Sequence, residues 1–217
     1  MRGDVHVRFS ESAGVRFPRA THLVVGFQYK DDAERFLAAL RERLGKFNLE
    51  LSDEKTRLIE FGRFAAPNRK ARGEGKPDTF NFLGFTHSCG RTRRGQFCVL
   101  RTTIAKRVRA KLKAIRVELR ERLHRPIAET GQWLNAVLAG HYRYYGVPRN
   151  FYALQAFRYY VLRMWRWALR RRGDKKNRMT WSRVEHLARR WLPTPRIMHP
   201  YPSQRLCVTT RGKSPVH

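Results

Sequence analysis

The sequence predicts an α+β fold, in which a small sheet with one helix comes first and an all-helical region follows. Up to residue 101, short β-branched and aromatic runs alternate with turns that contain Gly or Pro, a pattern typical of strands. From residue 104 onward, apolar residues recur every three or four positions, which is typical of amphipathic helices. We therefore expect four regions: a poorly ordered junction (1–22), a sheet region (23–101), a helical region (102–192) and an extended basic tail (193–217).

The sheet region is expected to contain a strand, a helix, two short strands, a loop and a β-hairpin. Adjacent Val24 and Val25 favour the first strand, and apolar residues at helical spacing up to Gly45 favour the helix. The loop combines Gly, Pro and charge without any period. The expected bounds are 22–29 for the strand, 31–44 for the helix, both sides of Ser52-Asp53 for the short strands, 62–78 for the loop, and 79–87 with 97–101 for the hairpin.

The helical region is expected to contain four helices separated by Pro and Gly. A single apolar stripe from Ile104 to Leu123 predicts the first helix, which Pro126 ends or kinks. Thr180 or Ser182 is expected to cap the last helix. The expected bounds are 104–125, 129–145, 150–172 and 182–191.

The tetrapeptide Tyr29-Lys30-Asp31-Asp32 has the Tyr-x-Asp-Asp form that holds metal ions in reverse transcriptases. A polymerase needs two carboxylates that share two divalent ions, and in those enzymes the aspartates occupy a hairpin turn followed directly by an apolar strand. Here Ala-Glu-Arg-Phe-Leu-Ala-Ala-Leu follows, which is helical in composition and period. An Asp at a helix N-terminus accepts backbone hydrogen bonds and complements the helix dipole. We interpret the motif as a helix cap.

Net charge is the strongest functional signal. The chain has 47 Lys and Arg residues against 17 Asp and Glu, a formal charge of +30. Residues 79–217 hold 31 of the basic residues and 5 of the acidic ones, a net +26. A folded segment with this much self-repulsion is best explained by a polyanionic partner, and nucleic acid is favoured over a membrane surface.

The cysteines and the apolar runs bear on cofactors and compartment. Cys89, Cys98 and Cys207 lie far apart without a C-x-x-C pair, which argues against a disulfide framework and, even with His87 nearby, against a zinc site. No apolar run approaches the roughly 20 residues of a membrane span, and no signal-peptide pattern opens the chain. We expect a cytoplasmic protein with no membrane partner and no metal or other cofactor.

The segment 141–172 combines eight arginines and ten aromatic residues with no acidic residue. Arginine binds phosphate and stacks on bases, and Tyr and Trp offer stacking faces, a mixture that suits structured RNA better than duplex DNA. Four arginines fall within one stripe of the third helix: Arg163, Arg166, Arg170 and Arg171. Burying these guanidinium groups without partners would cost too much free energy, so we expect them to be exposed. Together with the basic face of helix 104–125, they are expected to form a groove along RNA backbone. The predicted RNA-binding residues are Lys106, Arg107, Arg109, Lys111, Lys113, Arg116, Arg120, Arg143, Tyr144, Tyr145, Arg158, Arg163, Arg166, Arg170, Arg171 and Arg172.

Helical spacing assigns most aromatic residues of the third helix to the core instead. The residues expected there are Tyr152, Phe157, Tyr160 and Trp167, with Phe151, Leu154, Leu162 and Trp165 extending the same packed face.

Three stretches in succession resemble the C-terminal half of bacterial group II intron reverse transcriptase/maturases: VVGFQYKDDAERFLAALRERLGKFNLELSDEKTRLIEFGRFA, FNFLGFTH and LNAVLAGHYRYYGV. The resemblance covers about residues 23–211. It implies that 23–61 and 79–101 are the end of a palm and that 104–190 form the thumb, or maturase domain, which grips intron RNA. Within FNFLGF, it gives Phe82, Leu83 and Gly84 the position of the primer grip.

The resemblance also implies that polymerase chemistry is lost. The family's Tyr-Ala-Asp-Asp box falls on Arg19, Ala20, Thr21 and His22, so both metal-binding carboxylates are missing, as are the finger motifs that belong further N-terminal. We expect an N-terminally truncated remnant that binds group II intron RNA, assists splicing and accepts DNA as a further partner. Mg²⁺ would enter only if a second chain completed the site in trans.

Other interpretations stay open. The chain could be half of a split reverse transcriptase completed in trans, a decayed fragment that folds in part, or a generic basic RNA-binding protein. Complementation by a partner chain would favour the first, and a cooperative melt of residues 79–217 would count against the second. Composition alone permits the third, and the oligomeric state is open in all of them.

Overall fold

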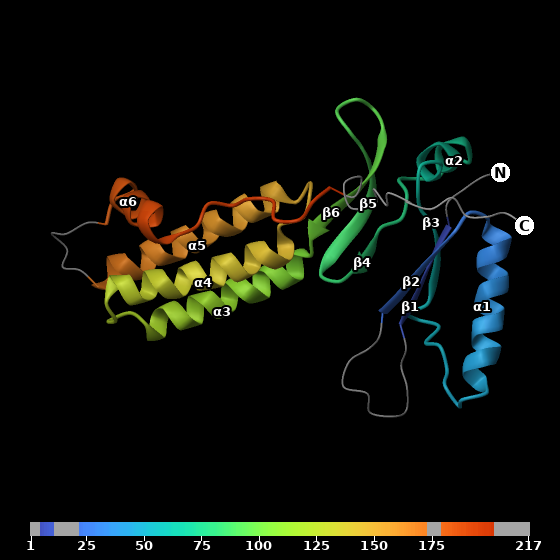
Figure 1. Cartoon of the computed structure of the whole chain (residues 1–217), viewed down its shortest axis with the longest axis horizontal. Coiled ribbons are helices and arrows are strands. Elements are labelled where there is room, and N and C mark those ends of the chain that lie inside the picture. The colour runs from blue at the N-terminus through green and yellow to red at the C-terminus, as the bar shows by residue number, and fades with distance from the viewer. Residues whose placement is uncertain (1–4, 11–21, 173–178, 202–217) are drawn as a thin grey trace, which may run out of the picture. The chain divides into compact units, whose positions relative to one another are not determined.

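A computed structural model describes residues 5–10, 22–172 and 179–201 of the 217-residue chain (Figure 1). The chain divides into two units, Met1–Leu100 and Arg101–His217. The described strands begin in the first unit, which also holds two helices, and the second unit is built from helices. The α+β fold class predicted from the sequence is therefore the one observed.

The first sheet is antiparallel, with the strand order β2-β1-β3. Its strands are β1 (Val5–Ser10), β2 (His22–Phe27) and β3 (Arg57–Glu60). Helix α1 (Lys30–Gly45) packs on it through buried Ala33 and through Phe36, whose ring centroid lies 5.1 Å from that of Phe27. Around Ser52-Asp53, the strand expected after the turn forms as β3, whereas before the turn Leu51 makes a single bridge.

Strand β1 corrects the expectation that residues 1–22 are poorly ordered. Val5–Ser10 pair with β2 over six residues and with β3 over four, so both edges of β1 have ladder partners. Its partner β3 comes much later in the chain, and a local pattern does not reveal such a pairing. The rest of 1–22, apart from His22, lies outside the described residues, including three positions matched to the metal-binding tetrapeptide: Arg19, Ala20 and Thr21.

The Asp31-Asp32 pair lies in the first turn of α1, which confirms the helix interpretation of the tetrapeptide. The specific role of helix cap is wrong, because α1 begins one residue earlier than predicted and the N-cap position falls on Tyr29, without a side-chain capping bond. Asp32 instead pairs with Arg35, one turn further along. Both carboxylates still complement the positive end of the helix dipole.

A short helix, α2 (Ala65–Ala71), replaces part of the loop expected over 62–78. Asn68 Nδ2 donates to Glu60 Oε1 at 2.9 Å, and Arg69 pairs with Asp78 at 3.1 Å. These partners come from outside the helix, so tertiary contacts hold two turns that lack an apolar period. Pro67 is tolerated because it falls in the first turn, where the backbone N–H has no helical acceptor.

The second sheet has the order β4-β5-β6, with β4 (Phe80–Phe82), β5 (Phe85–Arg91) and β6 (Phe97–Thr103). The single strand expected over 79–87 is wrong, because the chain reverses at Leu83-Gly84 and Phe82 pairs with Phe85. Leu83 has φ 46° and Gly84 has φ 84°. Two residues with positive φ are what a tight type I′ hairpin turn requires.

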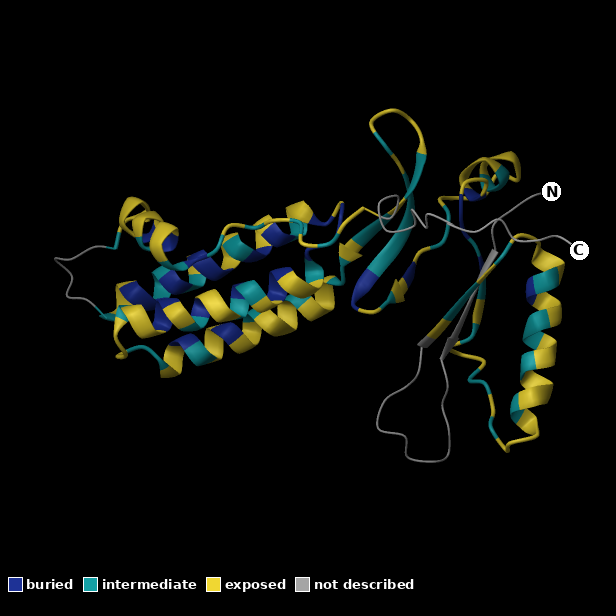
Figure 2. Ribbon diagram, in the orientation of Figure 1, coloured by how far each residue is buried: buried dark blue, intermediate teal, exposed yellow. Residues whose placement is uncertain are grey.

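The helical unit consists of α3 (Ala105–Glu121), α4 (Ile127–Tyr145), α5 (Phe151–Arg172) and α6 (Trp181–Trp191). Figure 2 shows buried residues along one side of each long helix and exposed residues along the other. Trp165 and Phe157 of α5 are fully buried against leucines of α3 and α4. Helix α3 ends at Glu121, before the expected end at residue 125, and Pro126 is the N-cap of α4. Thr180 caps α6 by accepting from the Arg183 N–H at 3.3 Å.

The side chain of Asn150 stabilises the junction between α4 and α5 through hydrogen bonds. It is 1% exposed, and its Oδ1 accepts from the Thr103 N–H at 3.1 Å. Its Nδ2 donates to Thr103 Oγ1 and to the Tyr145 carbonyl, both at 2.8 Å. One amide therefore ties the end of α4, the start of α5 and the residues that precede α3.

The part of the tail that is described, up to residue 201, contains no helix or strand after α6, as expected. It runs back along the helices (Figure 1). Tyr142 Oη and Arg158 Nε both donate to the Pro193 carbonyl, and the Met198 N–H donates to the Gly146 carbonyl at 2.7 Å. Residues 202–217 lie outside the described residues.

Candidate nucleic-acid interface

The cations of the helical unit have few anionic neighbours. Helix α5 contains no carboxylate, and α3 contains Glu118 and Glu121. The ion pairs formed between described residues of this unit are Arg122–Glu118 and Arg125–Glu129, at and just beyond the C-terminal end of α3. The remaining described arginines on α3 and α5 therefore carry charge without a described carboxylate within 4.0 Å. Such a surface carries a positive potential that attracts anions.

Three guanidinium groups surround the indole of Trp167 in α5. Arg116 and Arg120 of α3 lie 5.6 and 5.7 Å from its ring centroid, and Arg171 of α5 lies 5.0 Å from it. No two of these groups can be further apart than the sum of their distances to that centroid, about 11 Å. Even this maximum distance is only slightly longer than the Debye length of about 8 Å at physiological salt, so dissolved ions screen the repulsion between the guanidinium groups only in part. Cation–π attraction to the indole offsets some of it.

A hollow of about 310 Å³ lies between α3 and α5 beside this cluster, and we call it the α3–α5 groove. Its floor is apolar and includes Leu119, which is 1% exposed. Its rim carries the charges of Arg116 and Arg163, and Tyr160 stands in the wall with 46% of its surface exposed. The full lining is Leu112, Arg116, Leu119, Tyr160, Arg163, Met164 and Trp167.

A second set of stacked groups continues from Arg163 toward α6. The Arg163 guanidinium lies 5.7 Å from the Tyr159 ring, and that ring is nearly parallel to Trp181 at 6.4 Å and 8°. Arg166 lies 4.4 Å from the Trp181 ring, and its Nε donates to the Met179 carbonyl. Alternating guanidinium and aromatic planes therefore extend along α5 onto the start of α6.

The structure brings together only part of the predicted RNA-binding set. Arg116, Arg120, Arg163 and Arg171 meet at the α3–α5 groove. Lys106, Arg109 and Lys113 are exposed and recur at three- and four-residue spacing on the flank of α3 that carries Arg116 and Arg120. Arg170 is exposed near the end of α5, and Arg172 is the last residue of that helix.

The other predicted residues lie elsewhere, and the expectation of one groove is wrong for Arg107, Lys111 and Arg166. Arg107, Lys111, Tyr144 and Tyr145 line a different hollow, of about 390 Å³, between α3 and α4. Arg158 lines a third hollow together with Glu185 of α6, Arg166 faces Trp181 as described, and the Arg143 carbonyl bonds to His199. The physical reason is that the apolar stripe of α3 contacts both α4 and α5, which leaves its basic residues on two separate flanks.

The core assignment of the α5 aromatics is right for some residues and wrong for others. Phe157 and Trp165 are fully buried, as are Leu154 and, nearly so, Leu162. Tyr152 is 79% exposed and Tyr160 is 46% exposed, because only one side of this 22-residue helix packs against its neighbours. Phe151 is also exposed, and Trp167 is half-buried. Sequence reasoning also missed Tyr159 and Trp181 as interface candidates, although Tyr159 lies four residues before Arg163.

His141 is a core residue of the helical unit rather than an acid–base group. It is 8% exposed and stacks on Phe157, with ring centroids 3.8 Å apart and planes within 16°. Burial, with a smaller contribution from the charge of Lys111, lowers the pKa of His141 to about 4. The ring is therefore neutral at physiological pH. Its neighbour Tyr142 is buried as well, and burial raises the pKa of that phenol to about 12.

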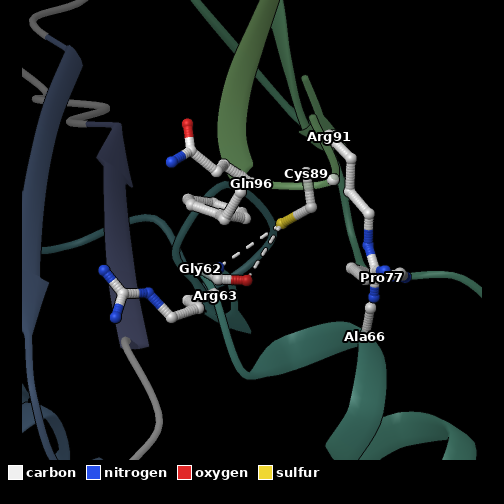
Figure 3. A pocket seen from close by; sticks show the side chains of 10 residues that line it. Gly62, Arg63, Ala66, Pro77, Cys89, Arg91 and Gln96 are labelled. Atoms are coloured by element: carbon white, nitrogen blue, oxygen red, sulfur yellow. Dashed lines mark hydrogen bonds between the residues drawn. The ribbon is translucent and has the colours of Figure 1, made fainter. Parts of the chain in front are cut away.

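The first unit contains a larger hollow, of about 690 Å³, around Cys89 (Figure 3). The Cys89 sulfur points at Gly62, accepting from its N–H at 3.4 Å and donating to its carbonyl at 3.7 Å, and Arg91 extends toward Pro77. Burial raises the pKa of the Cys89 thiol, so it is not an activated nucleophile. Among the described residues, no group of three or more His, Cys, Asp or Glu side chains is arranged to hold a metal ion. His87 stacks on Phe80 at 4.8 Å instead.

Of the predicted primer-grip residues, Phe82 ends β4, and Leu83 and Gly84 form the turn to β5. Leu83 is 62% exposed, Gly84 is buried and Phe82 is half-buried.

Comparison of the chain with protein-family models and with curated proteins finds no match to either. None of the described helices has both the length and the apolar character needed to cross a bilayer.

Proposed function

We propose that the helical unit binds structured RNA, and that the chain is related to group II intron-encoded reverse transcriptase/maturases, grips intron RNA and assists splicing. In this proposal the first unit corresponds to the end of a palm and α3–α6 to the thumb. The chain acts in the cytoplasm, where Cys89 and Cys98 stay reduced.

The observation that carries the RNA-binding proposal is the arginine cluster around Trp167. Three guanidinium groups from two helices converge on one ring without a described carboxylate beside them. Cation–π attraction offsets only part of the repulsion between like charges this close, and an anion between them would relieve the rest. Guanidinium groups bind phosphate in a bidentate manner, because the planar fork matches two phosphate oxygens.

Exposed aromatic rings favour RNA with unpaired bases over regular duplex DNA. Tyr159 and Tyr160 are both more than 40% exposed on the face of α5 that also carries Arg163. Unpaired bases stack on such rings, whereas bases inside a B-form duplex do not reach them. Folded RNA offers both the phosphates and the loops that this surface can use.

Polymerase chemistry is not part of the proposal for this chain alone. Asp31 and Asp32 lie in a helix, where they complement its dipole rather than share metal ions. If a second chain supplied the carboxylates, cDNA synthesis with Mg²⁺ would appear only after that chain was added.

The test measures binding of a folded group II intron RNA to the full chain by filter retention. Changing Arg116, Arg163 and Arg171 to Glu should abolish retention, because three attractive contacts become repulsive ones. The matched control changes Arg107, Lys111 and Arg143 to Glu, which alters net charge equally on other surfaces of the same unit. Equal affinity of the two triple variants would reject the α3–α5 surface as the RNA site.

The salt dependence of binding gives a second measurement. If the four arginines at the groove each neutralise one phosphate, the slope of log affinity against log salt is about −3 to −4. Affinity should then fall roughly 100-fold between 50 and 200 mM salt. A slope near zero for the unaltered chain would contradict phosphate binding altogether.

A further inference from the structure

The α3–α5 groove combines three kinds of surface within one small hollow. Its floor is aliphatic, formed by Leu112, Leu119 and Met164, its wall carries the Tyr160 ring, and its rim is cationic. None of its lining residues is acidic. At about 310 Å³ it is at the lower end of the range for small-ligand sites, roughly 300–1,000 Å³.

We propose that this groove holds one unpaired nucleotide of the bound RNA. The base lies on the aliphatic floor against Tyr160, and the phosphates on either side of it are held by the arginines at the rim. The inference rests on the RNA-binding function proposed above and assigns the chemical unit that this site receives.

Trp167 and Tyr160 have different roles in this proposal, because guanidinium groups already cover the ring of one and not of the other. The Trp167 indole has two faces and already has three guanidinium groups around it at 5.0 to 5.7 Å. Trp167 therefore serves as a platform that orients Arg116, Arg120 and Arg171, and their N–H edges remain directed at phosphate. Tyr160 lines the groove and has no guanidinium group stacked on it among the described residues, so its ring is the stacking partner for the base.

The occupant must have a flat, largely apolar part and at least two negative charges close to it. A nucleotide within an RNA strand meets both requirements, because its base is planar and each side of the sugar carries a phosphate. A base inside an A-form helix is stacked and paired, so the nucleotide must come from a loop, a bulge or a single strand. An acidic protein segment would meet the charge requirement but would place no flat group against the Tyr160 ring.

The test compares two short RNA oligonucleotides of equal length and charge, one with bases and one abasic throughout. The full chain should bind the base-bearing strand more tightly, by about 5- to 150-fold, the range for one base stacked on an aromatic ring. Tyr160→Leu should reduce this ratio at least about fivefold, because it keeps an apolar side chain and removes the ring. The control is Tyr152→Leu, the same change at a 79% exposed position of α5 that does not line the groove, and it should leave the ratio unchanged.

Each outcome decides one claim. If the abasic strand binds as tightly as the base-bearing strand, or if Tyr160→Leu behaves like Tyr152→Leu, the nucleotide site is refuted while RNA binding stands. If polyglutamate of equal charge binds more tightly than the RNA strand and is insensitive to Tyr160→Leu, the groove receives an acidic protein segment instead. Loss of RNA retention in the groove charge reversal, together with a reduced base preference in Tyr160→Leu, supports both proposals.

Discussion

Asn150→Ala is expected to remove a large part of the stability of the helical unit. The side-chain amide is 1% exposed and makes three hydrogen bonds, two of them to backbone groups, the Thr103 N–H and the Tyr145 carbonyl. Truncation leaves the Thr103 N–H without this partner, whereas the Tyr145 carbonyl still accepts from the Val147 N–H at 2.8 Å. A buried polar group that loses its partner costs about 1–3 kcal/mol, which is the expected loss. Small domains have about 5–15 kcal/mol in total.

Urea unfolding followed by tryptophan fluorescence measures this loss. All five tryptophans lie in the second unit, at positions 133, 165, 167, 181 and 191, so the signal reports on that unit within the full chain. With a urea slope of about 2 kcal/mol per M, the midpoint should fall by about 0.5–1.5 M. The control is Asn135→Ala, the same change at an exposed position of α4, which should leave the midpoint nearly unchanged. If Asn150→Ala matches that control, the amide does not anchor the junction.

Three further single changes test the same unit. His141 has a pKa of about 4 when folded and about 6.5 when unfolded, so the unfolded state takes up a proton first as the pH falls. Stability should drop by up to about 1.4 kcal/mol per pH unit between these values, and His141→Phe should remove this component when urea midpoints at pH 7 and pH 5 are compared. Gly131→Ala should destabilise by about 1–3 kcal/mol, because its Cβ would lie 2.6 Å from Trp191 Cγ. Gly140→Ala in the same helix meets open space and should raise the thermal midpoint by removing a glycine from a helix interior, a gain of up to about 1 kcal/mol.

The long helices could be predicted from the sequence because their apolar period is carried by the residues themselves. The period from Ile104 to Leu123 and the break at Pro126 give α3 to within a few residues. Helix α2 could not be found in this way, because its partners Glu60 and Asp78 come from outside it. Strand β1 was not predicted for the same reason, since its pairing with β3 joins distant parts of the chain.

The site was predictable in composition but not in layout. Charge and aromatic content indicate a nucleic-acid surface, yet they do not say which flank of α3 faces α5. That choice is made by the core, where Leu119 and Ile115 pack against α5 and bring Arg116 and Arg120 to Trp167. Asn150 shows the same limit, because its importance depends on Thr103 and Tyr145 being near it in space.

The crowding of guanidinium groups around Trp167 also has a consequence for the protein without its partner. Mutual repulsion opposes packing of α3 against α5, and small anions from the buffer relieve it. Ionic strength therefore acts in opposite directions on the two properties of this unit: it strengthens the fold and weakens the complex. Dilute buffer is the condition in which the free protein is least stable and its hold on RNA is tightest.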